Sequence, residues 1–434
     1  MVVWVLSPPY KKDFIKEGRC EQETSLFDTT YPPLSMAQIA AILRRKFDIK
    51  LYDCIAQKIN EKRIIQLFKN QNPKIVFINT TTPTFENDIN LTKQLSEISK
   101  TTKFYVYGVH AKYFSNEKYG KNIILLSKEP EEIAYELIGK NFSFEDLPTP
   151  AWDLVEIKNY KLPIKNKSFL LIQTSRGCPY SCIFCTAPFY YGKKYRKKRV
   201  TSIIEEIKAI KKLGIDEIVF YSEIFTFDKD YVIEICNEII KQNLKINWMC
   251  NSRIDSVDEN LLKLMKKSGC YMISYGIENF NQNILNKSKK GINANKIRHT
   301  IGITNKSGIL SFGHFILGLP GDSNKNLIKN IKISSKIGLD FAFYYIATPF
   351  PGSALFEFFK NKKNKFSNIH YNKNQVNKNL NLEKYQNKAY KHFYFNLNMI
   401  KTIVRIVSIM GIKYFPTMII SGIKSTLKIL KNEN

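Results

Sequence analysis

The chain has 434 residues, of which 44% are hydrophobic and 13% aromatic. A chain of this length and composition is expected to form two or three domains with a substantial core, which excludes an intrinsically disordered protein. No run of about 18 uncharged apolar residues occurs, so no membrane-spanning helix is predicted. The short apolar start of the chain is expected to be a strand rather than a signal peptide. We therefore expect a cytoplasmic protein.

The net charge is +29, from 67 basic and 38 acidic residues. Such a charge is typical of proteins that bind nucleic acid or anionic lipid. Only ten of the basic residues are arginine, however, and arginine is the side chain preferred for contacts with bases and phosphates. Because asparagine and isoleucine are also abundant, we favour a biased composition as the main cause, and a nucleic-acid partner is not expected.

Residues 1–140 alternate short apolar runs with amphipathic ones. The predicted strands are Val2–Leu6, Ile49–Tyr52, Ile75–Asn79, Phe104–Tyr107 and Ile123–Leu126. The predicted helices are Ser35–Arg45, Lys62–Lys69, Glu86–Ser99 and Pro130–Ile138. This alternation predicts a Rossmann-like, doubly wound α/β domain with a parallel sheet. Ligands of such sheets bind beyond the carboxyl ends of the strands.

Residues 141–167 are predicted to be a linker, because its two closely spaced prolines do not continue a helix. A second alternation over 168–355 predicts a (β/α)6 partial barrel, with its chemistry at the carboxyl ends of the strands. The predicted strands are Ser168–Thr174, Glu217–Tyr221, Ile246–Cys250, Met272–Gly276, Ser311–Gly318 and Phe341–Ala347. The predicted helices are Ser202–Leu213, Tyr231–Lys241, Glu259–Lys267, Asn293–Ser307 and Lys325–Ile337. Ser202 and Glu205 have the spacing of a capping box, which places the start of the first helix at Ser202.

Residues 356–434 are predicted to be a basic, helical C-terminal region. Lys362–Lys378 is rich in asparagine and lysine and is expected to be a loop. From Lys391 onward there are seven Lys or Arg residues and one acidic residue, Glu433. Apolar residues between Met399 and Met410 recur at helical spacing. Two interpretations stay open: peripheral contact with the inner face of an anionic membrane, or packing of the apolar side on the barrel.

Eight cysteines in a chain without an export signal argue against a disulfide framework. Three of them form a C-x3-C-x2-C motif directly after a predicted strand, Cys178-Pro-Tyr-Ser-Cys182-Ile-Phe-Cys185. Three neighbouring thiolates suit a soft metal centre. A closed zinc site takes four protein ligands, so three leave one metal position open to a small molecule. A zinc site completed by a distant residue and three unconnected thiols stay as alternatives.

This cysteine spacing, with the aromatic Phe184 before the last cysteine, resembles the cluster motif of the radical S-adenosylmethionine superfamily. The resemblance implies that Cys178, Cys182 and Cys185 ligate a 4Fe–4S cluster whose fourth iron binds S-adenosylmethionine. It implies an enzyme that cleaves this cofactor reductively to a 5′-deoxyadenosyl radical, which abstracts hydrogen from the substrate. An electron donor such as flavodoxin or ferredoxin is then expected.

Polar residues at the ends of the following predicted strands resemble the family's contacts with S-adenosylmethionine. By this resemblance Ser222 and Glu223 are candidates for binding its amino group, although relatives often have two acidic residues there. Arg253 is a candidate for the methionyl carboxylate and Glu278 for the ribose hydroxyls. At each position the alternative is a solvated or structural side chain.

Two further features have an ordinary interpretation. His314 has apolar neighbours and is expected to be a core histidine. The basic run Lys193–Arg199 is expected to be a solvated loop, with attraction of an anionic substrate or an electron donor as the alternative.

A Rossmann-like domain before such a barrel resembles the cobalamin-binding subgroup of the superfamily. The resemblance implies methyl transfer to an unactivated carbon. The Asp-x-His-x-x-Gly signature that ligates cobalt would start at Asp53, but Ile55 replaces the histidine and Lys58 the glycine. Cobalamin bound without that ligand and a vestigial domain both stay open.

Other candidates are a radical oxidoreductase or cyclase without methyl transfer, and a non-catalytic iron–sulfur or cobalamin sensor. The substrate is expected to be a small or lipid-like molecule.

Overall fold

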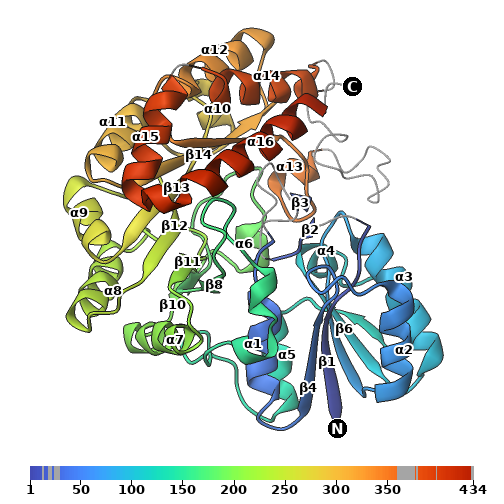
Figure 1. The fold of residues 1–434 in the computed structure, drawn as a ribbon. Helices are drawn as coiled ribbons and strands as arrows, with labels where there is room; N and C mark the ends of the chain where they lie inside the picture. The colour runs from blue at the N-terminus through green and yellow to red at the C-terminus, as the bar shows by residue number, and fades with distance from the viewer. Residues whose placement is uncertain are drawn as a thin grey trace.

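The structure, a computed structural model, describes residues 1–11, 14–17, 22–23, 30–358, 377, 380–396 and 398–431. Two parallel sheets lie side by side and a group of helices from the end of the chain covers the second (Figure 1). This arrangement confirms the predicted fold class. The predicted loop Lys362–Lys378 and Cys20 lie outside the described residues, except for position 377.

The first sheet has five parallel strands in the order β4-β1-β5-β6-β7. The strands are β1 (Val2–Ser7), β4 (Asp48–Asp53), β5 (Ile75–Asn79), β6 (Lys103–Tyr107) and β7 (Ile123–Leu125). The helices are α1 (Leu34–Leu43), α2 (Glu61–Gln71), α3 (Phe85–Ile98), α4 (Val109–Tyr113) and α5 (Pro130–Leu137). Val3 and Val5 of β1 pack in the core with α1, while Trp4 and Leu6 pack in the core with α2 and α3. Successive side chains of a strand face opposite sides, so the sheet is covered on both faces.

The second sheet has six parallel strands in the order β15-β14-β13-β12-β11-β8, with β8 and β15 at its edges, as a partial barrel requires. The strands are β8 (Phe169–Ile172), β11 (Glu217–Phe220), β12 (Asn247–Arg253), β13 (Cys270–Glu278), β14 (Leu310–Leu317) and β15 (Phe341–Ile346). The helices between them are α7 (Val200–Lys212), α8 (Lys229–Lys241), α9 (Glu259–Lys267), α10 (Gln282–Lys287), α11 (Asn295–Lys306) and α12 (Asn324–Ser334). Helices α4 and α10 were not predicted from the sequence, nor were the short elements β2 (Phe14–Ile15), β3 (Gln22–Glu23), β9 (Ser175–Arg176), α6 (Ala187–Tyr190), β10 (Arg196–Lys197) and α13 (Ala354–Glu357).

The predicted capping box at Ser202 is wrong. Helix α7 begins at Val200, and its N-cap residue Arg199 makes no side-chain capping bond. The pairing of β10 with β9 leads the chain into the helix earlier, because Lys198 donates its backbone N–H to the carbonyl of Thr174 at 2.9 Å. Ser202 therefore lies inside the helix.

The basic run Lys193–Arg199 is largely solvated, as predicted, because Lys193, Lys194, Lys197 and Arg199 are exposed, but it is not simply a loop. Part of it forms β10, and four of its six cations contact carboxylates from elsewhere in the chain. The pairs are Arg196–Glu129, Lys197–Asp228, Lys198–Glu206 and Arg199 with Glu145 and Asp146. Lys198 is buried. Most of this charge is therefore compensated within the protein.

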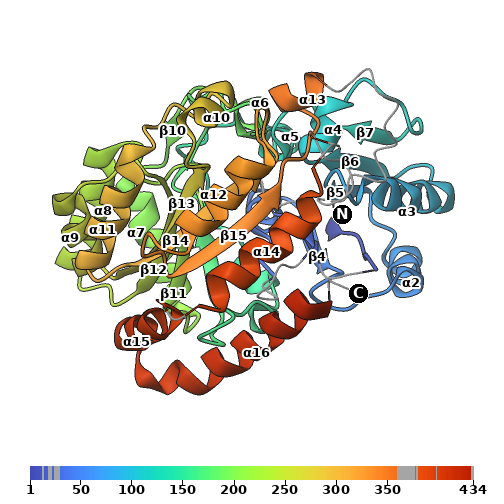
Figure 2. The same cartoon turned by 90° about the horizontal axis from the view of Figure 1, so that it is seen from above.

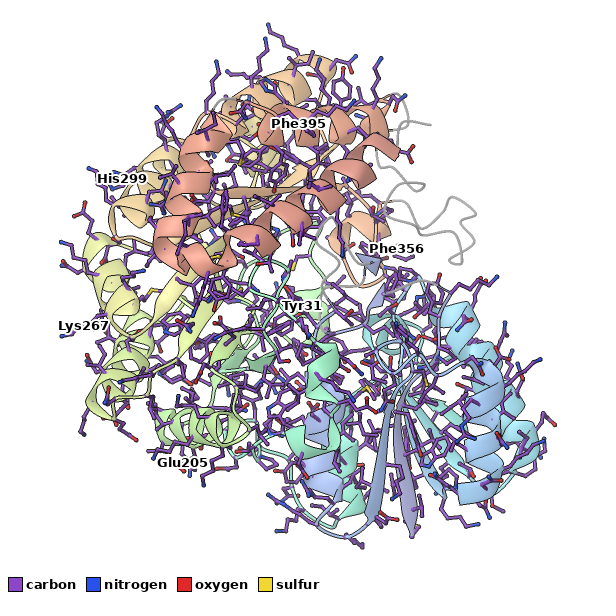
Figure 3. All side chains as sticks on the ribbon, viewed as in Figure 1. Tyr31, Glu205, Lys267, His299, Phe356 and Phe395 are labelled. Atoms are coloured by element: carbon purple, nitrogen blue, oxygen red, sulfur yellow. The ribbon has the colours of Figure 1, made fainter. Side chains whose placement is uncertain are left out.

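Buried ion pairs join the start of helix α5, after the first sheet, to strand β9 before the cysteine motif. The guanidinium of Arg176 donates to Glu129 at 2.7 Å and to Glu131 at 2.6 Å, and all three side chains are buried. Tyr31 and Phe356 lie along the boundary between the two sheets (Figure 3). The ring of Tyr31 contacts that of Phe169, and the ring of Phe356 contacts an aromatic side chain of α4. The boundary is therefore both charged and aromatic.

The connector after the first sheet lies along it. Trp152 is fully buried in the core, and the hydroxyl of Tyr160 donates to Asp53 at 2.7 Å. Asp53, the first residue of the predicted cobalt-ligating signature, thus holds the connector in place.

Three helices follow the barrel: α14 (Leu382–Tyr394), α15 (Asn398–Met410) and α16 (Phe415–Lys431). Helix α14 packs on β15 and α12, while α15 and α16 lie along an outer edge of the molecule (Figure 2). Within the described ranges, no single helix has the length and apolar character needed to cross a membrane, although α15 and α16 pass that test as a pair bent by 120°.

Candidate active site

The cysteine motif lies on the loop between β9 and α6, at the carboxyl end of the barrel. Gly177 precedes Cys178 with φ +91°, and a Cβ there would stand 2.1 Å from the carbonyl oxygen of Lys194, so only glycine fits. The loop is also fixed at its middle, where Ile183 donates its N–H to the carbonyl of Ser288 at 3.1 Å. The sequence thus builds a tightly held loop that presents the three thiols.

A cavity of about 320 Å³ opens beside this loop. The lining includes most of the predicted site residues, namely Cys178, Cys182, Cys185, Phe184, Glu223, Arg253 and Glu278. Side chains from the ends of several barrel strands thus meet the three thiols in one place, as the order of the strands predicts.

Ser222 is the predicted residue that the structure does not bring to the cavity lining. Its hydroxyl accepts hydrogen bonds from the backbone N–H groups of Thr174 at 3.2 Å and Ser175 at 3.1 Å. The side chain is buried and holds the segment that leads into the cysteine loop. Of the predicted polar pair, Glu223 faces the cavity.

Glu278 ends β13 in an unusual conformation. Its φ is +65°, and the register with β14 shifts between Gly276 and Glu278. A left-handed conformation in a non-glycine residue is strained and persists where its surroundings hold it. Here Lys290 donates to the carboxylate at 2.8 Å, and both side chains are buried. The strain and the ion pair together place this carboxylate at the cavity wall.

Arg253 reaches the cavity with its guanidinium already engaged. Nε and Nη2 donate to the two carboxylate oxygens of Asp255 at 2.9 and 3.0 Å, and Nη1 donates to the carbonyl of Lys290 at 3.0 Å. The guanidinium also lies 3.7 Å from the ring centroid of Tyr180, within the cysteine motif. These contacts tie the end of β12 to the cysteine loop.

His314 lines the cavity, and the expectation of a core histidine is wrong. Its Nδ1 lies 3.1 Å from the hydroxyl of Tyr345, and its ring stacks on Phe312. Because the neighbours of His314 in the sequence are apolar, the sequence suggested a core position. The alternation of side chains along β14 could have indicated that His314 faces the cavity, because the inward-facing side chains of a barrel strand line its interior.

Comparison with known proteins identifies the family. The model of the radical SAM superfamily matches residues 172–332, which contain the cysteine motif and most of the cavity. Residues 172–332 of the chain form a radical S-adenosylmethionine domain.

Two curated relatives of this radical S-adenosylmethionine protein have different reactions in their names. An uncharacterised methyltransferase of Pyrococcus horikoshii is 29% identical over 363 residues, covering 76% of this chain and 79% of that protein. The anaerobic magnesium-protoporphyrin IX monomethyl ester cyclase of Rubrivivax gelatinosus is 29% identical over 233 residues, covering 52% of this chain and 42% of that protein. The chain thus spans less than half the length of the cyclase.

A solved structure shares the fold of most of this chain. The radical S-adenosylmethionine methyltransferase TsrM of Kitasatospora setae, with cobalamin and a [4Fe–4S] cluster bound, has a TM-score of 0.61 at 13% identity. The match covers 81% of this chain and 76% of that chain. At this identity the likeness concerns the fold.

As a radical S-adenosylmethionine enzyme, the protein uses a 4Fe–4S cluster and S-adenosylmethionine, and the three thiols at its cavity fit the cluster. Among the residues that the structure describes, no three His, Cys, Asp or Glu side chains converge on a point that suits a single metal ion. Three thiols around one cavity instead suit a cluster, in which each thiolate has its own iron. Burial raises the pKa of the Cys182 thiol to about 11, with Lys290 opposing that rise. Cluster iron would supply the positive charge that the thiolate needs.

Replacing Gly276 with alanine is expected to weaken S-adenosylmethionine binding about fivefold or more, since overpacking costs about 1–3 kcal/mol. The new Cβ would stand 2.7 Å from the Glu278 carboxylate and 2.8 Å from the Lys290 ammonium, so this pair must move. Equilibrium dialysis on cluster-loaded protein measures the Kd. Gly302→Ala in α11 is the matched control, because its Cβ meets nothing within 4 Å. An unchanged Kd for S-adenosylmethionine in Gly276→Ala would show that Glu278 does not contact this cofactor.

Proposed function

We propose that the protein is a cobalamin-dependent radical S-adenosylmethionine methyltransferase acting on an unactivated carbon of a small or lipid-like substrate. One observation carries this proposal: the carboxyl edge of the first sheet contacts the segments on both sides of the cysteine motif. Glu129, after β7, pairs with Arg176 before the motif. Lys112, in the helix after β6, donates to the carbonyl of Tyr190 after the motif at 2.8 Å. A ligand beyond the carboxyl ends of the first sheet would therefore lie beside the cavity.

In this proposal the three thiols would hold the cluster, which when bound would supply the electron for reductive cleavage of S-adenosylmethionine. Phe184 packs against the wall beside the motif, with Ile316 and Ala347. Glu223 and Glu278 are the polar contacts for the bound cofactor, as the sequence predicted. Arg253 acts through Tyr180 and Asp255, and Ser222 acts by holding the loop; both are positioning residues.

The division of the chain is proposed as the sequence predicted it. Residues 1–140 form the cobalamin-binding domain, 141–167 the linker, 168–355 the catalytic barrel and 356–434 the C-terminal region. Cobalamin, when bound, would carry the methyl group. Ile55 stands where a cobalt-ligating histidine would, and His110, the sole histidine before residue 140, packs between the rings of Phe85 and Phe114. The proposal therefore includes cobalamin bound without a histidine from that loop.

A second function, radical oxidation or cyclisation without methyl transfer, is favoured by that missing histidine and by the cyclase named among the relatives. Both functions need an electron donor, for which we propose a flavodoxin or a ferredoxin. Both also fit a cytoplasmic protein whose C-terminal helices contact a membrane peripherally.

The two functions are separated by one experiment on anaerobically reconstituted protein with dithionite. Release of 5′-deoxyadenosine, together with the spectrum of bound hydroxocobalamin and formation of methylcobalamin, is the expected result. Release of 5′-deoxyadenosine without any bound cobalamin would support the oxidoreductase or cyclase instead. An intact cluster with no 5′-deoxyadenosine would contradict both and indicate a sensor.

A further inference from the structure

Helices α15 and α16 and the 3-10 turn between them (Ile412–Tyr414) expose large apolar side chains. Six of them, with 44–74% of each side chain exposed, form what we call the apolar face: Ile400, Val404, Ile412, Ile419, Ile420 and Ile423. Isolated exposed apolar residues are ordinary, but a group of this kind on two adjoining helices marks an interaction surface.

The opposite side of the same helices is firmly attached to the barrel. Ile406 is buried with Tyr271 and Phe341, at the amino ends of the strands. Arg405 donates to Asp340 at 2.9 Å, which anchors α15. Thr417 and Ser421 donate to the carbonyls of Ile164 and Pro163, which anchors α16. The orientation of both helices is thus set by the barrel, and the apolar face is held outward.

The segment that carries the apolar face has charged side chains of a single sign. Residues 384–432 contain no aspartate or glutamate. Lys401, Lys413 and Lys424 are exposed and adjoin Ile400, Ile412 and Ile423 in the sequence. Both helices lie on the outside of the molecule, in front of the barrel in Figure 1 and along the lower edge in Figure 2. The surface therefore combines apolar side chains with unopposed lysines on an outer edge.

We propose that this face rests on an anionic lipid surface, with α15 and α16 lying flat on the headgroups. Apolar residues flanked by lysine are the pattern of interfacial helices, and each lysine near an anionic surface adds to the attraction. The 120° bend between the helices lets both lie on one surface without either crossing it. This deepens the membrane contact within the proposed function, and it holds the enzyme by the end of the barrel opposite the cysteine cavity.

The test is flotation of the full-length holoprotein with vesicles of equal parts phosphatidylglycerol and phosphatidylcholine, against phosphatidylcholine alone. Binding to the anionic vesicles is expected, and Ile420→Glu/Ile423→Glu should lower the partition coefficient about tenfold or more, since both side chains would leave the interface. Lys413→Gln and Lys424→Gln should each lower it about fivefold. Ile233→Glu on α8, an exposed isoleucine of another helix, is the matched control and should bind as the unaltered protein does.

Release of 5′-deoxyadenosine is measured on every variant, so that a failure of the radical chemistry and a failure of membrane binding are read separately. The proposal would be overturned if wild-type protein did not bind the anionic vesicles. Equal binding to neutral vesicles would overturn the role of the lysines. A dimer in sedimentation that Ile420→Glu/Ile423→Glu converts to a monomer would assign the face to a second copy, and competition by flavodoxin would assign it to an acidic protein.

Discussion

Cys182→Ala protein is expected to assemble no stable 4Fe–4S cluster and to release no 5′-deoxyadenosine. Three of the four cluster irons take one protein thiolate each, and with two thiolates left a second iron has no protein ligand. Cys178, Cys182 and Cys185 are the cysteines that line the cavity in the described part of the chain. No further thiol there can therefore take the place of Cys182. Iron and sulfide analysis after anaerobic reconstitution measures assembly, and chromatography of the reaction mixture measures cleavage.

Cys236→Ala is the matched control for this experiment. Cys236 lies in α8, fully buried in the barrel core and away from the cavity lining, and burial raises the pKa of its thiol to about 12. It is therefore an inert core thiol, and its removal should leave iron content and cleavage unchanged. Full iron and sulfide content in Cys182→Ala would show that the motif does not hold the cluster.

The second large effect is expected for Arg176→Gln, which should lower the free energy of unfolding by about 3–5 kcal/mol. This guanidinium is 3% exposed and joins Glu129 and Glu131, at the start of helix α5 after the first sheet, to the strand before the cysteine motif. Removing it leaves two buried carboxylates without their main cation, and such unpaired charge is costly. Urea unfolding at neutral pH measures the change.

The ion pair between Arg176 and Glu129 makes the free energy of unfolding depend on pH in a predictable direction. Burial opposes ionisation of Glu129, but Arg176 and Arg196 outweigh it and hold the pKa of this carboxyl below its ordinary value. A carboxyl whose pKa is lower in the folded state stabilises the fold at neutral pH, and this contribution is lost as the pH falls through the folded pKa. The difference between wild-type and Arg176→Gln stability should therefore shrink on acidification.

Arg199→Ala provides the control at the same boundary. Arg199 pairs with Glu145 and Asp146, but its side chain is 60% exposed, so a loss of about 1 kcal/mol or less is expected. Equal losses in the two variants would mean that burial of the Arg176 network contributes nothing to joining the two sheets.

The sequence by itself determined the order and type of the main elements and the cluster motif. Both signals are local: the apolar period of a strand or helix spans a few residues, and Cys178, Cys182 and Cys185 lie within one short loop. The strand order also placed Glu223, Arg253 and Glu278 correctly at one end of the barrel, because parallel strands bring their carboxyl ends together.

Only the tertiary structure decided which partner each polar side chain has. Ser222 and Glu223 are neighbours in the chain, yet one bonds to the backbone before the cysteine loop and the other faces the cavity. Arg196 and its neighbouring cations pair with carboxylates from distant segments, and His314 lines the cavity rather than lying in the core. Helices α15 and α16 pack some of their apolar side chains on the barrel and expose others. A side chain's partner depends on contacts between residues far apart in the chain, and the local spacing of residue types does not encode those contacts.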